Sequence, residues 1–125
     1  MAKRILMVDD SAVVRGSLRA MLEDDRAGLA AHCEEAPDGS QAIAKARQIR
    51  PDLIVLDLSM PVMNGLEAAR ELKRIFPEVP IIMYTSYASD ALRDLALAAG
   101  IKMVVDKTHP DNLLLAIHAS LKSAA

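Results

Sequence analysis

The sequence predicts an α/β fold built on a parallel sheet, and two features of the chain support this. Short runs rich in Val, Ile and Leu alternate with longer segments whose apolar residues recur at helical spacing, and five such pairs can be counted. One of the runs, Leu53–Leu56, is aliphatic throughout, as expected for a strand that helices cover on both faces.

The first pair combines a strand at Arg4–Val8 with a helix at Ala12–Glu23. Spacing places four apolar residues on one face of that helix: Val14, Leu18, Met21 and Leu22. Between strand and helix lies the stretch "DDS". Asp10 or Ser11 can cap the helix, because a side-chain oxygen there accepts an otherwise unpaired backbone N–H. One cap explains one acid, whereas this stretch has two.

The second and third pairs occupy the middle of the chain. A weaker strand at His32–Glu35 leads through the turn signal "PDG" into a helix that stops at Arg50-Pro51. The apolar residues of that helix are Ile43, Ala46 and Ile49. The third strand, Leu53–Leu56, ends on Asp57, and the loop "LSMPVMNG" precedes a helix at Leu66–Ile75. In that loop Asn64 or Gly65 can adopt backbone angles that other residues resist, which supports the segment carrying Asp57.

The last two pairs follow the same pattern. Pro77 and Pro80 frame the approach to a strand at Ile81–Tyr84, and Gly100 is suited to end the helix that follows. The expected inward residues of this fourth helix are Leu92, Leu95 and Ala99. A short strand at Met103–Val105 precedes a helix that begins near Pro110. Its expected inward residues are Leu113, Leu114, Ile117 and Leu121.

Composition limits the classes of function. A chain of 125 residues suits one globular domain, and we expect residues 1–125 to form it. The balance of 15 Lys and Arg against 17 Asp and Glu leaves no basic surface for nucleic acid or an anionic membrane, so neither is expected as a partner of this domain alone. The single cysteine, Cys33, is expected in the core, which suits a reducing cytoplasm. The four apolar residues between Arg4 and Asp9 are too few for a signal peptide or a membrane span.

Charged and hydroxyl residues gather where the expected strands end. Asp9 and Asp10 follow the first strand, Asp57 the third, Thr85 the fourth and Lys107 the fifth. In an open parallel sheet, ligands bind outside the carboxyl ends of the strands, so we expect these side chains to share one pocket. Adjacent carboxylates repel each other, so such a pair usually has a cation to hold. Any one of these residues alone fits a capping or loop role, whereas their joint placement indicates a site.

Four stretches carry a resemblance to a known family: "VDDS", "PDLIVLDLSMPVMNGLE", "YTS" and "VVDK". In this order and spacing they resemble the receiver domain of bacterial two-component response regulators, of the chemotaxis-regulator type, over nearly the whole chain. The resemblance implies a flavodoxin-like, doubly wound sheet of five parallel strands in the order 2-1-3-4-5, with five helices. It also implies a cytoplasmic phosphoprotein of a two-component system, not an enzyme in the ordinary sense, which assists its own phosphorylation and dephosphorylation.

The resemblance assigns a role to each strand-end residue. Asp57 is the phosphoacceptor that becomes an aspartyl phosphate, Thr85 is the switch hydroxyl, and Lys107 pairs with the phosphoryl group. Asp9 and Asp10 bind Mg²⁺, with Mn²⁺ as the alternative, and Asp57 and the backbone carbonyl of Ser59 complete the metal ligands. Mg²⁺ takes oxygen ligands and keeps several waters, which suits a few carboxylates and a phosphoryl oxygen. Backbone N–H groups near Leu58 and Ser86 are further expected contacts of the phosphoryl group.

The resemblance also implies the partners. A sensor histidine kinase or a phosphotransfer protein supplies the phosphoryl group, and a downstream protein reads the face made by the fourth helix, fifth strand and fifth helix. The domain is expected to be a monomer or a phosphorylation-dependent dimer. It is either a stand-alone regulator or the receiver part of a longer DNA-binding response regulator, because "MNGLEAARELK" resembles receivers that precede helix-turn-helix domains.

Three other classes fit less well. A haloacid-dehalogenase-type phosphatase needs a D-x-D-x-T/V stretch after its first strand, whereas Asp9 here is followed directly by Asp10 and Ser11. A flavodoxin needs a hydroxyl- and Gly-rich phosphate loop and usually aromatic cover, and Trp is absent. A degenerate receiver that only binds proteins is disfavoured because the acid pair, Asp57, Thr85 and Lys107 are all present.

The chain departs from the family pattern at two places. Val104 stands where most members have Tyr or Phe, whose rotation accompanies movement of the switch hydroxyl, and its stiff, short side chain cannot swing in this way. We expect Tyr84 or Tyr87 to take over this readout; the alternative is that Val104 weakens coupling and leaves the surface half-active. Thr108 and His109 follow Lys107 where many members have Pro, so the loop into the last helix is expected to differ. The resemblance marks Ser59 and Tyr87, two residues beyond Asp57 and Thr85, as positions expected to tune the lifetime of the phosphorylated form.

Overall fold

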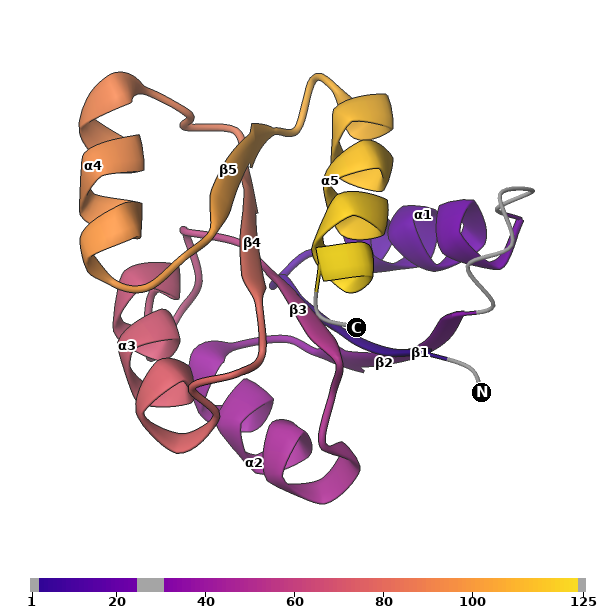
Figure 1. The fold of residues 1–125 in the computed structure, drawn as a ribbon, viewed down its shortest axis with the longest axis horizontal. Coiled ribbons are helices and arrows are strands. Elements are labelled where there is room, and N and C mark those ends of the chain that lie inside the picture. Colours follow the sequence, from indigo (N-terminus) through magenta and orange to yellow (C-terminus); the bar gives the residue numbers. More distant parts are fainter. Residues whose placement is uncertain (1–2, 25–30, 124–125) are drawn as a thin grey trace.

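A computed structural model describes residues 3–24 and 31–123 of the chain, and in this part five strands alternate with five helices (Figure 1). The strands are β1 (Lys3–Val8), β2 (Ala31–Ala36), β3 (Leu53–Leu56), β4 (Ile81–Thr85) and β5 (Met103–Asp106). The helices are α1 (Ala12–Glu23), α2 (Gly39–Ile49), α3 (Gly65–Ile75), α4 (Asp90–Ala98) and α5 (Pro110–Ser123). Every expected strand is confirmed, and four of them are one or two residues longer than predicted.

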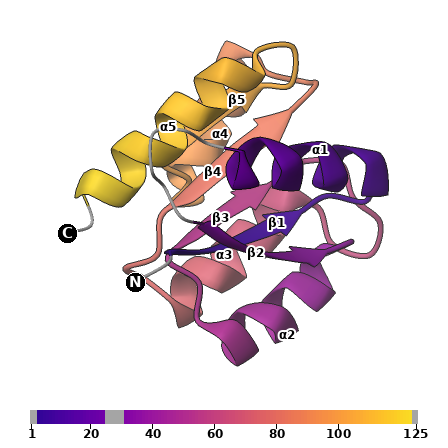
Figure 2. The same ribbon diagram turned by 90° about the vertical axis from the view of Figure 1, so that its right-hand side faces the viewer.

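The strands form one parallel sheet in the order β2-β1-β3-β4-β5, which confirms the doubly wound topology. Helices α1 and α5 cover one face of the sheet, and α2, α3 and α4 cover the other (Figures 1 and 2). From β1 the chain winds outward to β2 and then returns to the other side of β1 through β3. The connections on the two sides of this reversal leave the sheet in opposite directions, which opens a crevice at the carboxyl ends of β1 and β3.

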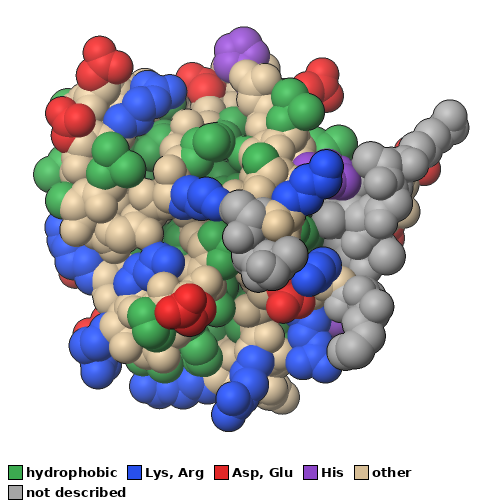
Figure 3. Space-filling model, in the orientation of Figure 1, with side chains coloured by type: hydrophobic (Ala, Val, Ile, Leu, Met, Phe, Trp, Pro, Cys, Tyr) green, Lys and Arg blue, Asp and Glu red, His purple; other side chains and the backbone are tan. Residues whose placement is uncertain are grey.

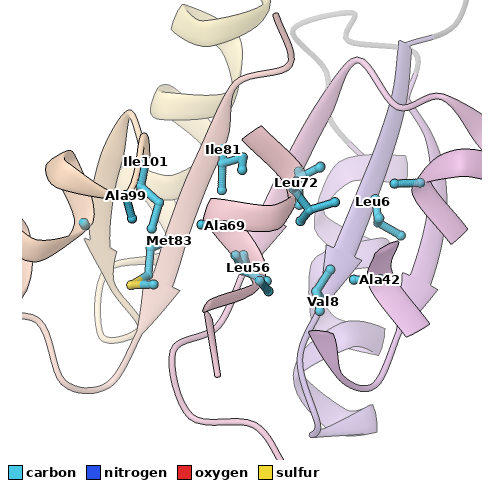
Figure 4. Packing of buried hydrophobic residues seen from close by; sticks show 14 of the residues in the cluster. Leu6, Val8, Ala42, Leu56, Ala69, Leu72, Ile81, Met83, Ala99 and Ile101 are labelled. Atoms are coloured by element: carbon cyan, nitrogen blue, oxygen red, sulfur yellow. The ribbon is translucent and has the colours of Figure 1, made fainter. Parts of the chain in front are cut away.

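Two apolar clusters hold the layers together. The cluster between the sheet and α2, α3 and α4 includes Leu6, Leu56, Leu72 and Met83 (Figure 4). The cluster on the other face joins alternate strand residues to α1 and α5. Strand side chains point to opposite faces in turn, so the central strands must be aliphatic at every position, as Leu53–Leu56 is. Cys33 is buried and free, as expected for a core residue.

Polar side chains cap the helices where the sequence changes from apolar strand to loop. Ser11, Asp38, Asn64 and Ser89 each accept a hydrogen bond from a backbone N–H in the first turn of α1, α2, α3 and α4. The cap of α1 is therefore Ser11, which leaves Asp10 without a capping role. Arg50 adopts a left-handed conformation at the end of α2, in keeping with the predicted stop at Arg50-Pro51.

Two expectations about local structure are wrong. The sequence predicts that Leu95 faces the core, but this residue is 50% exposed, because α4 buries Leu92 and Ala96 instead. Asn64 and Gly65 do not adopt the left-handed backbone conformation in the loop after β3, where the non-glycine residue with positive φ is Val62. Gly65 is needed there because of space: a Cβ atom at this position would lie 2.1 Å from the carbonyl oxygen of Asp57.

Candidate functional site

The crevice at the carboxyl ends of the strands brings together the residues that the sequence singles out. Asp9 directly follows β1, Asp57 directly follows β3, Thr85 is the last residue of β4, and Lys107 directly follows β5. The ladder continues into the site, since the Asp57 N–H donates to the Val8 carbonyl at 2.9 Å and the Lys107 N–H donates to the Thr85 carbonyl at 2.9 Å. The Asp9 N–H likewise donates to the carbonyl of Ala36, the last residue of β2, at 3.1 Å, so the sheet fixes the backbone of all four residues directly.

Three carboxylates form the centre of the site. One oxygen from each of Asp9, Asp10 and Asp57 lies within 4.8 Å of the other two. Asp9 and Asp57 are only 3% and 5% exposed, whereas Asp10 faces solvent. Close hard oxygen donors, one of them open to water, suit a divalent cation that retains part of its hydration shell. The three acids could thus hold such an ion.

Lys107 reaches into the same crevice from the end of β5. Its Nζ lies 2.7 Å from Asp9 Oδ2 and 3.4 Å from Asp57 Oδ2, and its side chain is largely buried. Burial works to lower the pKa of Lys107, but the hydrogen bond to Asp9 and the charge of Asp57 outweigh it and hold the pKa above its ordinary value. The amine therefore carries its positive charge at neutral pH, next to the two buried carboxylates.

The surroundings of Asp57 disfavour its ionised form. Burial raises the pKa of Asp57 above its ordinary value, and the negative charge of Asp9 raises it further. Lys107 and the Leu58 N–H, which donates to Asp57 Oδ1 at 2.8 Å, offset only part of this effect. A cation placed among the acids would relieve the remaining repulsion, so the electrostatics of the site favour metal binding.

Thr85 and the two tyrosines near it occupy different environments. The Thr85 side chain is buried, and its Oγ1 accepts a hydrogen bond from the Tyr87 N–H at 3.1 Å. Tyr87 is 64% exposed on the loop that leads to α4. Tyr84 packs on the opposite face of the sheet, in the cluster with α1 and α5, and its hydroxyl donates to the Lys107 carbonyl at 3.4 Å. Of the two tyrosines, Tyr87 alone is tied to the Thr85 hydroxyl.

Val104 and Ser59 lie beside open depressions of the surface. Val104 packs at the edge of the cluster formed with α2, α3 and α4, which is the face opposite Tyr84. It also lines a groove of about 450 Å³ between β5, α4 and α5, together with Met103 and Leu115. Ser59 and Asp10 share another open depression at the end of β3.

The loop after Lys107 has its own hydrogen bonds. Asp106 Oδ1 accepts from both the N–H and the hydroxyl of Thr108, at 2.9 and 2.8 Å. A proline directly after Lys107 would have no N–H or hydroxyl to donate in this way. The segment between Lys107 and α5 is therefore held by a side-chain turn.

Two residues at this site are not singled out by the sequence patterns. Arg15 of α1 donates through Nη1 to the carbonyl oxygen of Asp9, and its Nε donates to Glu35 of β2 at 2.9 Å. The signal in the sequence is an arginine placed one turn into the helix that follows the acid pair. Arg15 contributes to the site only because its side chain crosses from α1 to the end of β1, and sequence spacing does not predict that crossing.

Comparisons with known proteins identify the relatives of this chain and of its fold. A sequence model described as "Response regulator receiver domain" matches residues 5–118. The chemotaxis protein CheY of Thermotoga maritima is 33% identical over 119 residues, which cover 94% of this chain and 97% of that protein. A protein-glutamate methylesterase/protein-glutamine glutaminase of Alkalilimnicola ehrlichii is 38% identical, over 89% of this chain but only 28% of that protein. The crystal structure of a CheY-like receiver domain protein from Methanospirillum hungatei superposes with a TM-score of 0.89 at 30% identity, covering 99% of this chain and 97% of that chain.

Proposed function

The chain belongs to the response regulator receiver family, and from this premise we propose that Asp57 accepts a phosphoryl group in a divalent-cation-dependent reaction that switches a protein-binding surface. The observation that carries the proposal is the grouping of Asp9, Asp10 and Asp57 within 4.8 Å, with the Lys107 amine 3.4 Å from Asp57. A buried carboxylate beside a fixed ammonium and two further acids suits phosphoryl transfer, which needs positioning and charge neutralisation more than covalent help.

The donor set of the site fits Mg²⁺, with Mn²⁺ as the alternative. Asp9, Asp10 and Asp57 would supply carboxylate oxygens, and we propose the Ser59 carbonyl as a further ligand, because Ser59 and Asp10 line the same open depression. When bound, the ion would supply positive charge that lowers the repulsion among the acids and stabilises charge on phosphoryl oxygens.

The protein's own residues would carry out the remaining steps. An Asp57 oxygen attacks the phosphorus of a phosphohistidine on a sensor kinase or phosphotransfer protein and forms the new P–O bond. The P–N bond breaks with its electron pair on the imidazole nitrogen, which takes a proton from solvent. The Lys107 amine, already charged at neutral pH, pairs with the phosphoryl oxygens. The Leu58 N–H, which bonds to Asp57 Oδ1, is placed to donate to a carboxyl oxygen of the new acyl phosphate. Hydrolysis of the aspartyl phosphate returns the carboxylate.

The switch would run through Thr85. Its hydroxyl now accepts from the Tyr87 N–H, and a phosphoryl group on Asp57 would offer that hydroxyl a stronger acceptor. Rotation of Thr85 toward the phosphoryl group would break the contact with Tyr87 and loosen the loop before α4. Val104 is too stiff to fill the vacated space, so we propose that Tyr87 rather than residue 104 carries the readout.

The surface that a downstream protein reads would be the groove of α4, β5 and α5. Exposed apolar residues surround it, and Figure 3 shows hydrophobic side chains across the part of the molecule that these elements form. Of the exposed apolar residues, Met103 and Leu115 line the groove itself, and Leu97 lines a second depression between α4 and β5. Among the described helices none is long and apolar enough to cross a membrane. We propose a cytoplasmic domain that binds no nucleic acid by itself, acting as a monomer or a phosphorylation-dependent dimer.

Residues 1–125 are proposed to form one receiver domain. A stand-alone regulator is supported by CheY of Thermotoga maritima, because the match covers 97% of that protein. The alternative is the receiver part of a longer DNA-binding response regulator. The Alkalilimnicola ehrlichii protein, in which the matching segment is 28% of the length, supports a receiver within a longer protein, and the DNA-binding part of this alternative rests on the resemblance of "MNGLEAARELK" alone.

Labelling with a small phosphodonor tests the function. Acetyl phosphate and Mg²⁺ should add one phosphoryl group, detected by intact-mass spectrometry, and EDTA should prevent the addition. Asp57→Asn is the matched variant, because it keeps the size of the side chain while removing the nucleophilic carboxylate. Equal labelling of Asp57→Asn would refute the assignment of the phosphoacceptor.

A further inference from the structure

The peptide that joins Asp9 to Asp10 is anchored on one side by an arginine. Its carbonyl oxygen accepts a hydrogen bond from Arg15 Nη1, and the Asp9 N–H donates to the Ala36 carbonyl at 3.1 Å. The peptide unit is planar, so fixing the direction of this carbonyl also fixes the direction in which the Asp10 Cα leaves the strand. Among the described residues, no hydrogen bond or ion pair holds the exposed Asp10 carboxylate. The placement of Asp10 therefore depends on its backbone.

Arg15 is itself held in place from β2. Its Nε donates to Glu35 Oε1 at 2.9 Å, and the other Glu35 oxygen lies 2.8 Å from Arg19 Nη2. The Arg15 side chain is only 15% exposed, in contrast to 36% for Arg19. Burial works to raise the pKa of Glu35, but the hydrogen bonds from Arg19 and Arg15 outweigh it, so Glu35 remains charged well into the acid range. A planar guanidinium fixed by one carboxylate presents its remaining N–H groups in one direction.

From this geometry we infer that Arg15, held by Glu35, is a positioning residue that orients the Asp9–Asp10 peptide so that the acid pair can bind a divalent cation. The inference rests on the proposed function, since it concerns the same metal site. The guanidinium of Arg15 is positively charged and points toward a site that binds a cation, so its charge alone would not favour this placement. Ligand-orienting contacts of this kind commonly change metal affinity by about 10-fold or more when they are removed.

The sign of the effect separates positioning from electrostatics. Removing a positive charge near a cation site should strengthen Mg²⁺ binding if Arg15 acts only through its charge. Removing a group that orients the ligands should weaken binding. The two accounts therefore predict opposite changes for the same substitution, Arg15→Gln.

The matched control is Arg19→Gln. Arg19 lies on the same helix and bonds to the same Glu35, but its hydrogen bond and ion pairs go to Glu35 and Glu23 rather than to Asp9. Calorimetric titration with Mg²⁺ should show about 10-fold weaker binding for Arg15→Gln and a change of less than about twofold for Arg19→Gln. In NMR spectra of the Mg²⁺-free proteins, the amide resonance of Asp10 should shift in Arg15→Gln and stay in place in Arg19→Gln.

Wild-type or tighter Mg²⁺ binding by Arg15→Gln would overturn the inference, as would equal losses in the two variants. If Arg15→Gln does not fold, Arg15→Lys decides, because it keeps the charge but its single amine cannot span Glu35 and the Asp9 carbonyl as the guanidinium does. Weaker Mg²⁺ binding by a folded Arg15→Lys supports the inference, and wild-type binding overturns it. A wild-type protein that binds no Mg²⁺ overturns the proposed function and this inference together.

Discussion

Replacing Gly65 with alanine should slow phosphorylation of Asp57, although the side chain of residue 65 takes no part in the reaction. Gly65 begins α3, and its N–H donates to the Leu58 carbonyl at 2.8 Å, which holds the start of the helix against the residue after Asp57. A Cβ atom at this position would lie 2.1 Å from the Asp57 carbonyl oxygen and 3.0 Å from the Leu58 Cα. Both of these neighbours are backbone atoms, so no side chain can rotate away to make room.

The size of the effect follows from this distance. Nonbonded carbon and oxygen atoms do not approach much closer than about 3 Å, so α3 and the Asp57 segment must separate by about 1 Å. We expect a loss of about 1–3 kcal/mol in the free energy of unfolding, as for other overpacked positions. A shift of this size in a reacting group costs about 100-fold in rate, so labelling by acetyl phosphate should slow by roughly that factor.

Gly16→Ala is the matched control, because a Cβ atom there meets nothing within 4 Å and the residue lies inside α1. It should stabilise the protein by about 0.5–1 kcal/mol and leave labelling unchanged. Urea unfolding and intact-mass time courses measure both quantities on both variants. If Gly65→Ala matched the wild type in stability and labelling rate, the steric requirement for glycine at this position would be refuted.

Three further outcomes are expected. Lys107→Ala should bind Mg²⁺ at least as tightly as the wild type, because Asp9 loses a competing cation 2.7 Å away, but it should accumulate much less phosphorylated protein. A large loss of Mg²⁺ affinity in this variant would contradict the division of roles. Tyr87→Ala should speed dephosphorylation several-fold by opening the acyl phosphate to water, while Ser59→Ala, at a side chain too small to shield it, should not; an unchanged rate in Tyr87→Ala would end the shielding idea. In EDTA, the free energy of unfolding should fall as pH rises from 3.8 through the raised pKa of Asp57, because the native state binds a proton in this range that the unfolded state has released. Urea unfolding of Asp57→Asn should lack this fall.

The fold and the grouping of the site can be predicted from the sequence because both depend on local periodicity and on one topological rule. Strand ends are visible as changes from aliphatic to polar residues, and a parallel sheet brings those ends to one edge, so Asp9, Asp57 and Lys107 can be grouped from their positions in the chain. The sequence pattern does not predict how closely, or in which rotation, each helix packs on the sheet. The exposure of Leu95 follows from the rotation of α4 on the sheet, where the small side chain of Ala96 packs closer than a leucine could.

Long side chains and steric gaps are the other features that sequence patterns miss. Arg15 contributes to the site by crossing from α1 to the carbonyl oxygen of Asp9, and the same arginine on a differently placed helix would be an ordinary surface residue. The sequence correctly links Gly65 to the Asp57 loop but for the wrong reason, because its φ is not positive and the constraint is the nearby backbone. Both cases depend on the distance between two segments, which only the packed fold defines.

The position of Tyr84 favours Tyr87 over Tyr84 as the proposed replacement for the missing aromatic ring at Val104. Neighbouring residues of a strand point to opposite faces, so Tyr84 and Thr85 cannot share a cavity, and Tyr84 is buried against α1 and α5. The Tyr87 N–H donates to the Thr85 hydroxyl, so we expect movement of that hydroxyl to change the Tyr87 backbone even if residue 104 stays still. A beryllofluoride-treated sample should therefore show NMR shift changes at Tyr87 and α4. If the changes stayed within the Asp57 pocket, Val104 would instead have uncoupled the surface from the site, and the half-active alternative would hold.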